Sequence, residues 1–167
     1  MTVDGTDFRC CEQQDRPTSW YSFKFNGPAV KYEVAIGSLT GNIVWVSDMY
    51  RGAVHDITIF RAHLKDMLAL EEEKAIADLG YRGRNEADTI DLPEHGSAQW
   101  QQQKSRARAR HETCNRRFKS WSVMQHRFRH SNIMYHQDCF HAVAVLTQLR
   151  LENGDALFDV GDMNGDI

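Results

Sequence analysis

The sequence predicts a mixed α/β fold in a single domain, and two patterns support that prediction. The first third of the chain alternates apolar and polar residues with the period of two typical of half-buried β-strands. The later part alternates short apolar runs with longer segments of helical spacing. We therefore expect a mixed sheet, with strands 1–3 antiparallel and strands 4–5 parallel, flanked by helices. A length of 167 residues favours one domain with one core.

The first strands are expected at Val3 and over residues 21–25, 30–36 and 43–46. Val3 precedes Asp4-Gly5-Thr6, which has the composition of a turn. The other three runs alternate in polarity or are rich in β-branched and aromatic residues. Because the turns between them are short, we expect antiparallel pairing.

The remaining elements follow from spacing and from residues that start or end helices and strands. Residues 56–68 have helical spacing behind Asp56, an acid typical of a helix N-cap. Residues 75–78 predict a buried strand before a glycine turn, and residues 89–92 predict an edge strand closed by a proline. Residues 94–103 are polar and predict a loop, and two helices are expected from residue 105 to 121 and from about 137 to 151.

Composition limits the class of protein. Hydrophobic residues make up 41% and charged residues 26%, as in ordinary globular domains. We place the domain at residues 1–152 and expect residues 153–167 to be an acidic, flexible C-terminal tail. The sequence has neither an apolar run long enough for a bilayer nor a secretory signal, so we expect an intracellular protein with no membrane partner and four reduced cysteines.

The net charge of −3 conceals a basic block at residues 104–119, which holds seven Lys or Arg residues and a single acid, Glu112. Such a block suits a surface that meets a polyanion. The alternative interpretation is an ordinary solvated helix face.

Acids at the ends of the predicted strands are the main functional feature. Asp4 closes the first strand and Asp78 closes the strand after the first helix, so parallel neighbours would bring both to one sheet edge. Glu112 would add a third carboxylate from the long helix. Clustered carboxylates favour a bound cation, and their hard oxygens suit Mg²⁺ or Mn²⁺, with two ions able to act on a phosphodiester. Each acid also has a structural alternative: a turn for Asp4 and Asp78, a helix N-cap for Asp56, and ion pairs with basic neighbours for Glu112.

Four stretches, in this order, resemble the DDE superfamily endonucleases, most closely PIF/Harbinger-type transposases and nucleases derived from them. They are Val3-Asp4-Gly5-Thr6, Gly52-Ala53-Val54-His55-Asp56, Ala77-Asp78-Leu79-Gly80-Tyr81 and the run from Arg110-His111-Glu112 to Lys119-Ser120-Trp121. The resemblance extends from about residue 2 to 150. It implies a ribonuclease H-like fold, nuclear localisation and cutting or joining of DNA with Mg²⁺ or Mn²⁺.

The same resemblance implies roles for the acids. Asp4, Asp78 and Glu112 would form the catalytic triad, with 33 residues between the last two, and Asp56 would be a further metal ligand. Asp56 is also the alternative second member of the triad. The chain begins at the first catalytic strand, without the helix-turn-helix region of such transposases. We therefore expect weak, unselective DNA binding, with a separate DNA-binding protein or self-association adding selectivity.

Three cations lie at offsets of −4, +4 and +7 from Glu112, and we predict that they contact DNA phosphates: Arg108, Arg116 and Lys119. A competing hypothesis is a truncated or domesticated relative that binds DNA or protein without catalysis. A zinc site is a further alternative, built from His126, His130, His136, Cys139 and His141. The tail residues 162–166 fail as a calcium loop, because their glycine is misplaced and no Glu follows.

Overall fold

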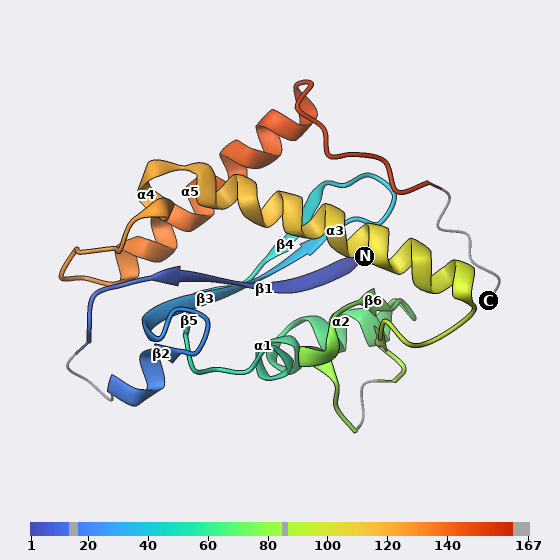
Figure 1. The fold of residues 1–167 in the computed structure, drawn as a ribbon, viewed down its shortest axis with the longest axis horizontal. Helices are drawn as coiled ribbons and strands as arrows, with labels where there is room; N and C mark the ends of the chain where they lie inside the picture. The colour runs from blue at the N-terminus through green and yellow to red at the C-terminus, as the bar shows by residue number, and fades with distance from the viewer. Residues whose placement is uncertain (14–16, 85–86, 162–167) are drawn as a thin grey trace.

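A computed structural model of the chain describes residues 1–13, 17–84 and 87–161. Its central sheet has the order β2-β3-β1-β6-β7, and two further short strands, β4 and β5, also pair with β3 (Figure 1). The strands are β1 (Thr2–Arg9), β2 (Tyr21–Ser22), β3 (Gly27–Ile36), β4 (Ile43–Val46), β5 (Tyr50–Arg51), β6 (Ala75–Ile76) and β7 (Ile90–Asp91). The expected mixed sheet is confirmed: β3 pairs antiparallel with β1 and β4, while β6 pairs parallel with β1 and β7.

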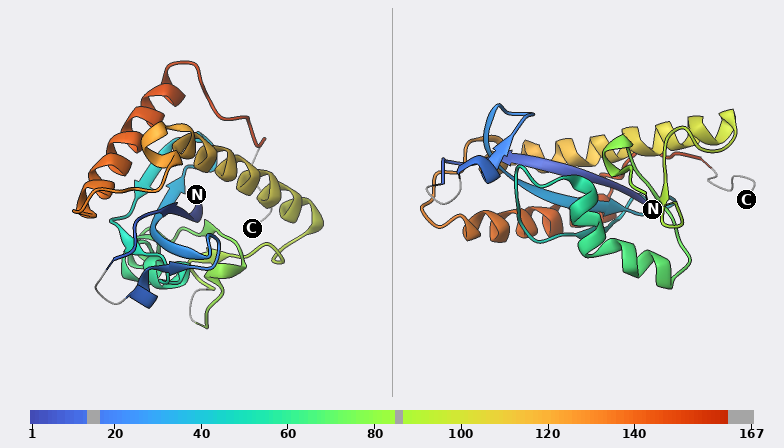
Figure 2. Two further views of the ribbon diagram at one scale, coloured as in Figure 1. Left: turned by 60° about the vertical axis from the view of Figure 1, so that its left-hand side comes forward. Right: turned by 90° about the horizontal axis from the view of Figure 1, so that it is seen from below.

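The long pair β1–β3 forms the centre of the sheet (Figure 2). Its register runs from Thr2 opposite Ile36 to Arg9 opposite Ala29. The expected turn at Asp4-Gly5-Thr6 is therefore wrong, because the strand continues through these residues with β3 pairing on one side. The predicted strand at residues 21–25 shortens to β2, and residues 23–26 form a turn.

Helices cover both faces of this sheet (Figure 1). On one face lie α1 (Asp56–Ala62) and α2 (Leu64–Leu70), whose Phe60 and Leu64 pack with Val3. On the other lie α3 (Ala98–Ser120), the short α4 (Ser122–Gln125) and α5 (Met134–Glu152), whose apolar residues pack on the side chains of β1 and β3 that face them. The two-residue alternation of β1 thus sends Thr2, Asp4, Thr6 and Phe8 toward α3.

Two helix starts differ from the sequence prediction. The helix expected from residue 105 begins at Ala98, because the Ser97 side chain accepts a hydrogen bond from the Trp100 amide at 3.2 Å and caps the helix within the expected loop. Asp56 is the first residue of α1 rather than its N-cap, which is His55. The N-cap interpretation of Asp56 is therefore wrong, and its carboxylate instead pairs with Lys31.

The C-terminal segment runs along α3. Val160 is 1% exposed and packs with Ile76 and Ala107. Arg106 donates to the Asp159 carbonyl at 3.2 Å, and Arg117 donates to the carbonyls of the segment that begins at Asp155. The region expected to be a flexible tail thus includes a stretch packed on the helix, while the rejected calcium loop at residues 162–166 lies outside the described residues.

A buried lysine ties the start of α3 to β7. The Lys104 side chain is fully buried, and its Nζ lies 2.8 Å from the Asp91 carboxylate and 2.8 Å from the His95 carbonyl oxygen, with a further bond to the Leu92 carbonyl. Removing one partner of a buried ion pair leaves the other charge unpaired. Lys104 is therefore a structural part of the basic block.

We predict that Lys104→Met lowers the free energy of unfolding by about 3 kcal/mol, because Asp91 and two carbonyls lose their shared donor. Lys74→Met, at an exposed position, is the matched control and should change it by less than about 0.5 kcal/mol. Chemical denaturation of both variants measures the difference. Equal stability of the two variants would show that Lys104 is not a structural anchor.

Candidate active site

Asp4 lies inside β1 and faces α3. Its Oδ2 accepts a hydrogen bond from Asn115 Nδ2 at 3.0 Å, and Asn115 is itself buried. Burial raises the pKa of Asp4 to about 7, with further contributions from the charges of Asp78 and Asp56. The backbone amide of Gly5 and the charge of Lys24 lower this pKa and only partly offset those effects. The structure therefore gathers three carboxylates near one partly buried strand position.

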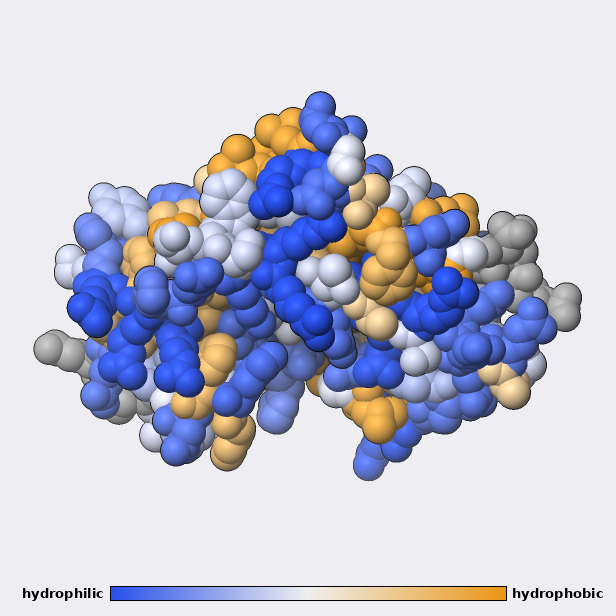
Figure 3. Space-filling model, turned by 45° about the horizontal axis from the view of Figure 1, so that its top comes forward, coloured by the Kyte–Doolittle hydropathy of each residue, from blue (hydrophilic) through white to orange (hydrophobic). Residues whose placement is uncertain are grey.

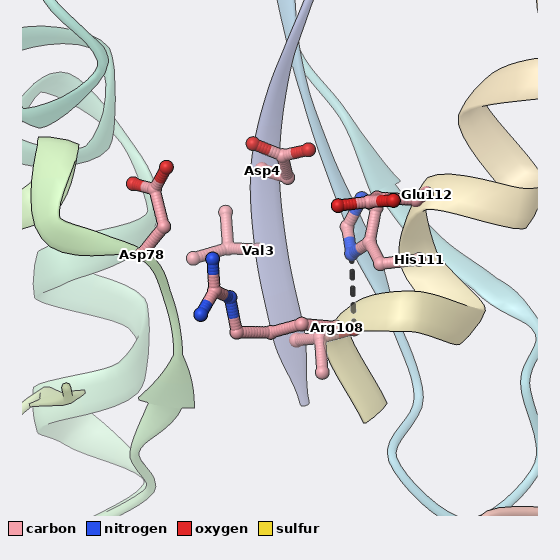
Figure 4. A pocket seen from close by; sticks show the side chains of 7 residues that line it. Val3, Asp4, Asp78, Arg108, His111 and Glu112 are labelled. Carbon is pink, nitrogen blue, oxygen red and sulfur yellow. Dashed lines mark hydrogen bonds between the residues drawn. The ribbon is translucent and has the colours of Figure 1, made fainter. Parts of the chain in front are cut away.

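Asp78 follows β6 and starts the short 3₁₀ helix η2 (Leu79–Tyr81), where its Oδ1 accepts from the Gly80 amide at 2.8 Å. Asp78 therefore has the structural role in a turn that the sequence also suggested. Its carboxylate in addition lines a small pocket together with Asp4. Figure 4 shows Asp78, Asp4 and Glu112 in a row across β1, with the Arg108 side chain reaching from α3 on the Asp78 side. The three acids predicted from the sequence therefore line one pocket.

The α3 wall of this pocket combines exposed and buried polar groups. The Glu112 side chain is 64% exposed and lies 3.9 Å from the Arg116 guanidinium, the helix pair expected from the spacing. Its neighbour His111 is buried, and burial lowers the pKa of His111 to about 3, so the ring is neutral. His111 Nδ1 lies 3.0 Å from the Thr2 hydroxyl and holds α3 against the beginning of β1.

Asp56 approaches the site from the opposite face of the sheet. A Cβ atom at Gly5 would lie 2.5 Å from Asp56 Oδ1, so only glycine allows this approach. A Cβ atom at Gly80 would lie 3.0 Å from Asp78 Oδ1 and 3.3 Å from Asp56 Oδ2, so both carboxylates converge on this glycine. A second pocket, on the Asp56 side, is also lined by Asp4 and Asp78. These two acids therefore lie where the two pockets meet.

Several charged residues of the second pocket were missed by the sequence analysis. Lys31 Nζ lies 2.9 Å from Asp56 and 4.0 Å from Asp7, so it neutralises part of the acidic cluster. Lys24 lines the same pocket and influences Asp4. The alternation of residues 30–36 could have indicated Lys31, because Lys31 shares a strand face with Glu33. No local sequence pattern indicated that Lys24 lies at the site.

Glu33 is a fully buried carboxyl behind this cluster, opposite Gly5 in the β1–β3 register. Burial raises the pKa of Glu33 to about 8, and the charge of Asp56 adds to that rise. The Tyr81 hydroxyl is near enough to lower this pKa, although the two groups do not reach full hydrogen-bond geometry. Glu33 alternates with apolar residues along β3, a pattern typical of a strand face exposed to solvent. In the structure, α1 and η2 cover this face.

The basic block divides into two sets. Four of its seven cations hold structure: Lys104 at β7, Arg106 and Arg117 at the C-terminal segment, and Arg110 at the carbonyls of Gly37 and Ser38. The other three are those predicted to contact DNA: Arg108, Arg116 and Lys119.

These three cations differ in setting. Arg108 lines the pocket beside Asp78 and makes no hydrogen bond or ion pair with any residue that the structure describes. The Arg116 side chain is 79% exposed. Lys119 lies over the Phe8 ring at 5.7 Å, and burial, followed by the charge of Lys24, lowers its pKa. Hydrophilic side chains dominate the face shown in Figure 3, with hydrophobic patches between them.

Within residues 1–13, 17–84 and 87–161, no three His, Cys, Asp or Glu side chains converge closely enough to hold one metal ion. Neither the four acids nor the candidate zinc ligands form such a group in that part of the chain. His136 instead lies 2.8 Å from the Tyr32 hydroxyl in the core, and His141 lies 3.1 Å from the Ser47 carbonyl oxygen.

The four cysteines are free, and no helix in the described part of the chain has the length and apolar character to cross a membrane.

Comparison with known proteins identifies the family of the chain. No curated protein and no solved structure matches the chain. The family described as DDE superfamily endonuclease matches residues 3–148, a stretch that contains Asp4, Asp56, Asp78 and Glu112. This match covers most of the 167 residues. The chain therefore belongs to the DDE superfamily of endonucleases.

Proposed function

We propose that this chain is the metal-dependent catalytic domain of a PIF/Harbinger-type transposase, or of a nuclease derived from one, with a ribonuclease H-like fold. Its substrate is DNA, whose phosphodiester bonds it hydrolyses or transesterifies in the nucleus. One observation carries the proposal: Asp4 and Asp78 lie where two pockets meet, with Glu112 on one side and Asp56 on the other. Family membership supplies the reaction class.

The donor chemistry fits Mg²⁺ or Mn²⁺. Asp4, Asp56, Asp78 and Glu112 offer hard carboxylate oxygens. The pKa of Asp4 is raised first by burial and then by the negative charges of Asp78 and Asp56, which a cation would offset. We propose that these four residues hold two ions, with Asp4, Asp78 and Glu112 as the catalytic triad. Such a pair of ions activates the attacking hydroxyl and stabilises the leaving oxygen when bound.

The remaining residues position the substrate. Arg108, Arg116 and Lys119 contact backbone phosphates on either side of the cleaved bond, and Lys31 keeps Asp56 oriented through its 2.9 Å ion pair. Phosphate contacts carry no sequence information, so we propose that a DNA-binding partner protein or self-association supplies site selection. No membrane partner is involved.

A second candidate is a non-catalytic relative that binds DNA or protein. The observation that favours it is the spread of the acids, since no three of them meet at one point within the described residues. Binding of the ions together with DNA would have to draw Glu112 inward from its exposed position on α3. Metal-dependent nicking of plasmid DNA by the pure chain separates the two candidates.

We predict that Asp78→Asn reduces Mg²⁺-dependent nicking by at least about 100-fold, because a direct metal ligand is lost. The melting temperature should not fall, since Asn keeps the oxygen that accepts from the Gly80 amide and one repulsive charge is removed. Asp66→Asn, an exposed acid in the first turn of α2, is the control and should cleave like the wild type. Full nicking by pure Asp78→Asn would refute the catalytic role, and a large fall in melting temperature would indicate a structural carboxylate.

We predict that the metal-free protein becomes less stable as the pH rises from about 6.5 to 8. At lower pH the buried His111 and His136, whose pKa values are lowered to about 3 and about 4, oppose the effect of the carboxyl groups. The pKa values of Asp4 and Glu33 are raised in the folded state, to about 7 and about 8. Folding therefore favours the protonated forms, and their stabilising effect is lost as the pH rises from the unfolded pKa of each group through its folded pKa. Thermal melting in chelator at several pH values measures this decline.

Two further comparisons attribute part of that decline to Asp4. At pH 8 in chelator, Asp4→Asn should melt at least about 2 °C above the wild type. Mg²⁺ should raise the melting temperature of the wild type more than that of Asp4→Asn. A flat pH profile, or an equal response of both proteins to Mg²⁺, would contradict the assignment of Asp4 to the ion site.

We predict that Arg116→Ala lowers the slope of log affinity against log salt by about one unit on duplex DNA, because one phosphate contact is lost. Arg106→Ala is the control on the same helix, since Arg106 is turned toward the C-terminal segment. Titrations of two unrelated duplexes at several salt concentrations provide the measurement. An unchanged slope, or discrimination between the duplexes above about 100-fold, would show that α3 does not bind DNA in this manner.

A further inference from the structure

The turn between β2 and β3 carries an exposed aromatic residue at the edge of the acidic site. Phe23 is 92% exposed, the highest value among the large hydrophobic residues of the described chain. It nevertheless lines the pocket that contains Asp4, Asp56 and Asp78. Single exposed hydrophobic residues are common on protein surfaces, so the location of Phe23, and not its exposure alone, requires an explanation.

The turn is held in place by contacts with β1. Ser22 Oγ donates to Asp7 Oδ2 at 2.8 Å, and the Arg9 guanidinium lies 4.9 Å from the centre of the Phe25 ring. The Tyr21 hydroxyl bonds to Asn26 across the turn, and the Tyr21 ring meets the Phe23 ring edge-on at 5.3 Å. Tyr21 and Phe25 are thus engaged in local packing, whereas the Phe23 ring extends to solvent from a supported position.

The residue after Phe23 adds positive charge at the same rim. Lys24 is exposed and lines the same pocket. Its charge acts on Asp4 and on Lys119, so it lies near the acids and near a cation that we predict to contact DNA. An aromatic face beside a phosphate-binding cation is the combination with which proteins hold single-stranded nucleic acid.

We infer that Phe23 and Lys24 bind an unpaired nucleotide next to the cleaved phosphate, with the Phe23 ring stacked on the base and Lys24 on the adjacent phosphate. A base within an intact duplex has both faces covered by its neighbours and cannot accept the ring. The substrate class is therefore DNA with a single-stranded or flipped-out base at the cutting site. The inference rests on the proposed function and specifies the substrate of that site.

Two DNA molecules of one sequence test this inference, one fully paired and one with a short single-stranded gap that contains 2-aminopurine. Their affinities for the full chain are measured by fluorescence anisotropy without divalent metal, so that no strand is cut. Phe23→Ala should weaken binding of the gapped DNA about ten-fold and leave the paired duplex within about two-fold. Phe23→Trp should retain the gapped-DNA affinity, and the complex with wild type should quench 2-aminopurine more than the complex with Phe23→Ala.

Leu70→Ala is the matched control, because Leu70 is 84% exposed on α2 and does not line the acidic pockets. It should bind both DNA molecules like the wild type. Equal losses on both DNA molecules, or no loss in Phe23→Ala, would overturn the inference; the second result would suit a contact with a protein instead. In either case wild-type DNA binding would leave the proposed function intact, whereas a wild type that binds neither DNA would refute both.

Discussion

Strand β1 is paired along both edges, and this double pairing determines where the acids lie. Eight residue pairs join it to β3, and one parallel pair, Thr2 with Ile76, joins it to β6. The antiparallel register holds Asp4 in the strand interior, where its side chain must face α3. The parallel pair brings the end of β6, and with it Asp78, alongside Asp4. A shift of β1 by one residue would turn Asp4 to the other face of the sheet and separate it from Asn115 and Glu112.

The site concentrates negative charge that the apo fold only partly neutralises. The charges of Asp78 and Asp56 act on Asp4, and Glu33 is buried behind them. Lys31 offsets some of this charge through its contacts with Asp56 and Asp7. The close approach of Asp56 depends on Gly5, since a Cβ atom there would lie 2.5 Å from Asp56 Oδ1, whereas a Cβ atom at Gly80 would lie 3.3 Å from Asp56 Oδ2. Repulsion of this kind reduces the stability of the free protein and favours a cation, which links the energetics of the fold to the proposed chemistry.

Helix α3 combines a structural role and a proposed substrate-binding role. One set of its cations anchors β7, the loop at Gly37 and the C-terminal segment, and the other set lies beside the pocket. The division follows from the helix period, because residues 108, 112 and 116 are separated by four and share a side of the helix. The side chains of His111 and Asn115 instead reach Thr2 and Asp4 and hold the helix against β1. Each of the two comes one position before a residue of that series. Charge on a helix therefore predicts an anion-binding surface only where tertiary contacts leave the cations accessible.

Residue periodicity and short motifs are local properties, so they were enough to predict the mixed α/β class, most of the helices and strands, the four candidate acids and the family. The three-dimensional arrangement, in contrast, makes Asp4-Gly5-Thr6 continue a strand, buries Lys104 and Arg110 as anchors, and places Glu33 in the interior. It also brought Lys24 and Phe23 to the acidic pocket and packed Val160 against α3. Each of these outcomes depends on a partner far away in the chain, since cross-strand pairing and burial are set by contacts that local patterns do not contain.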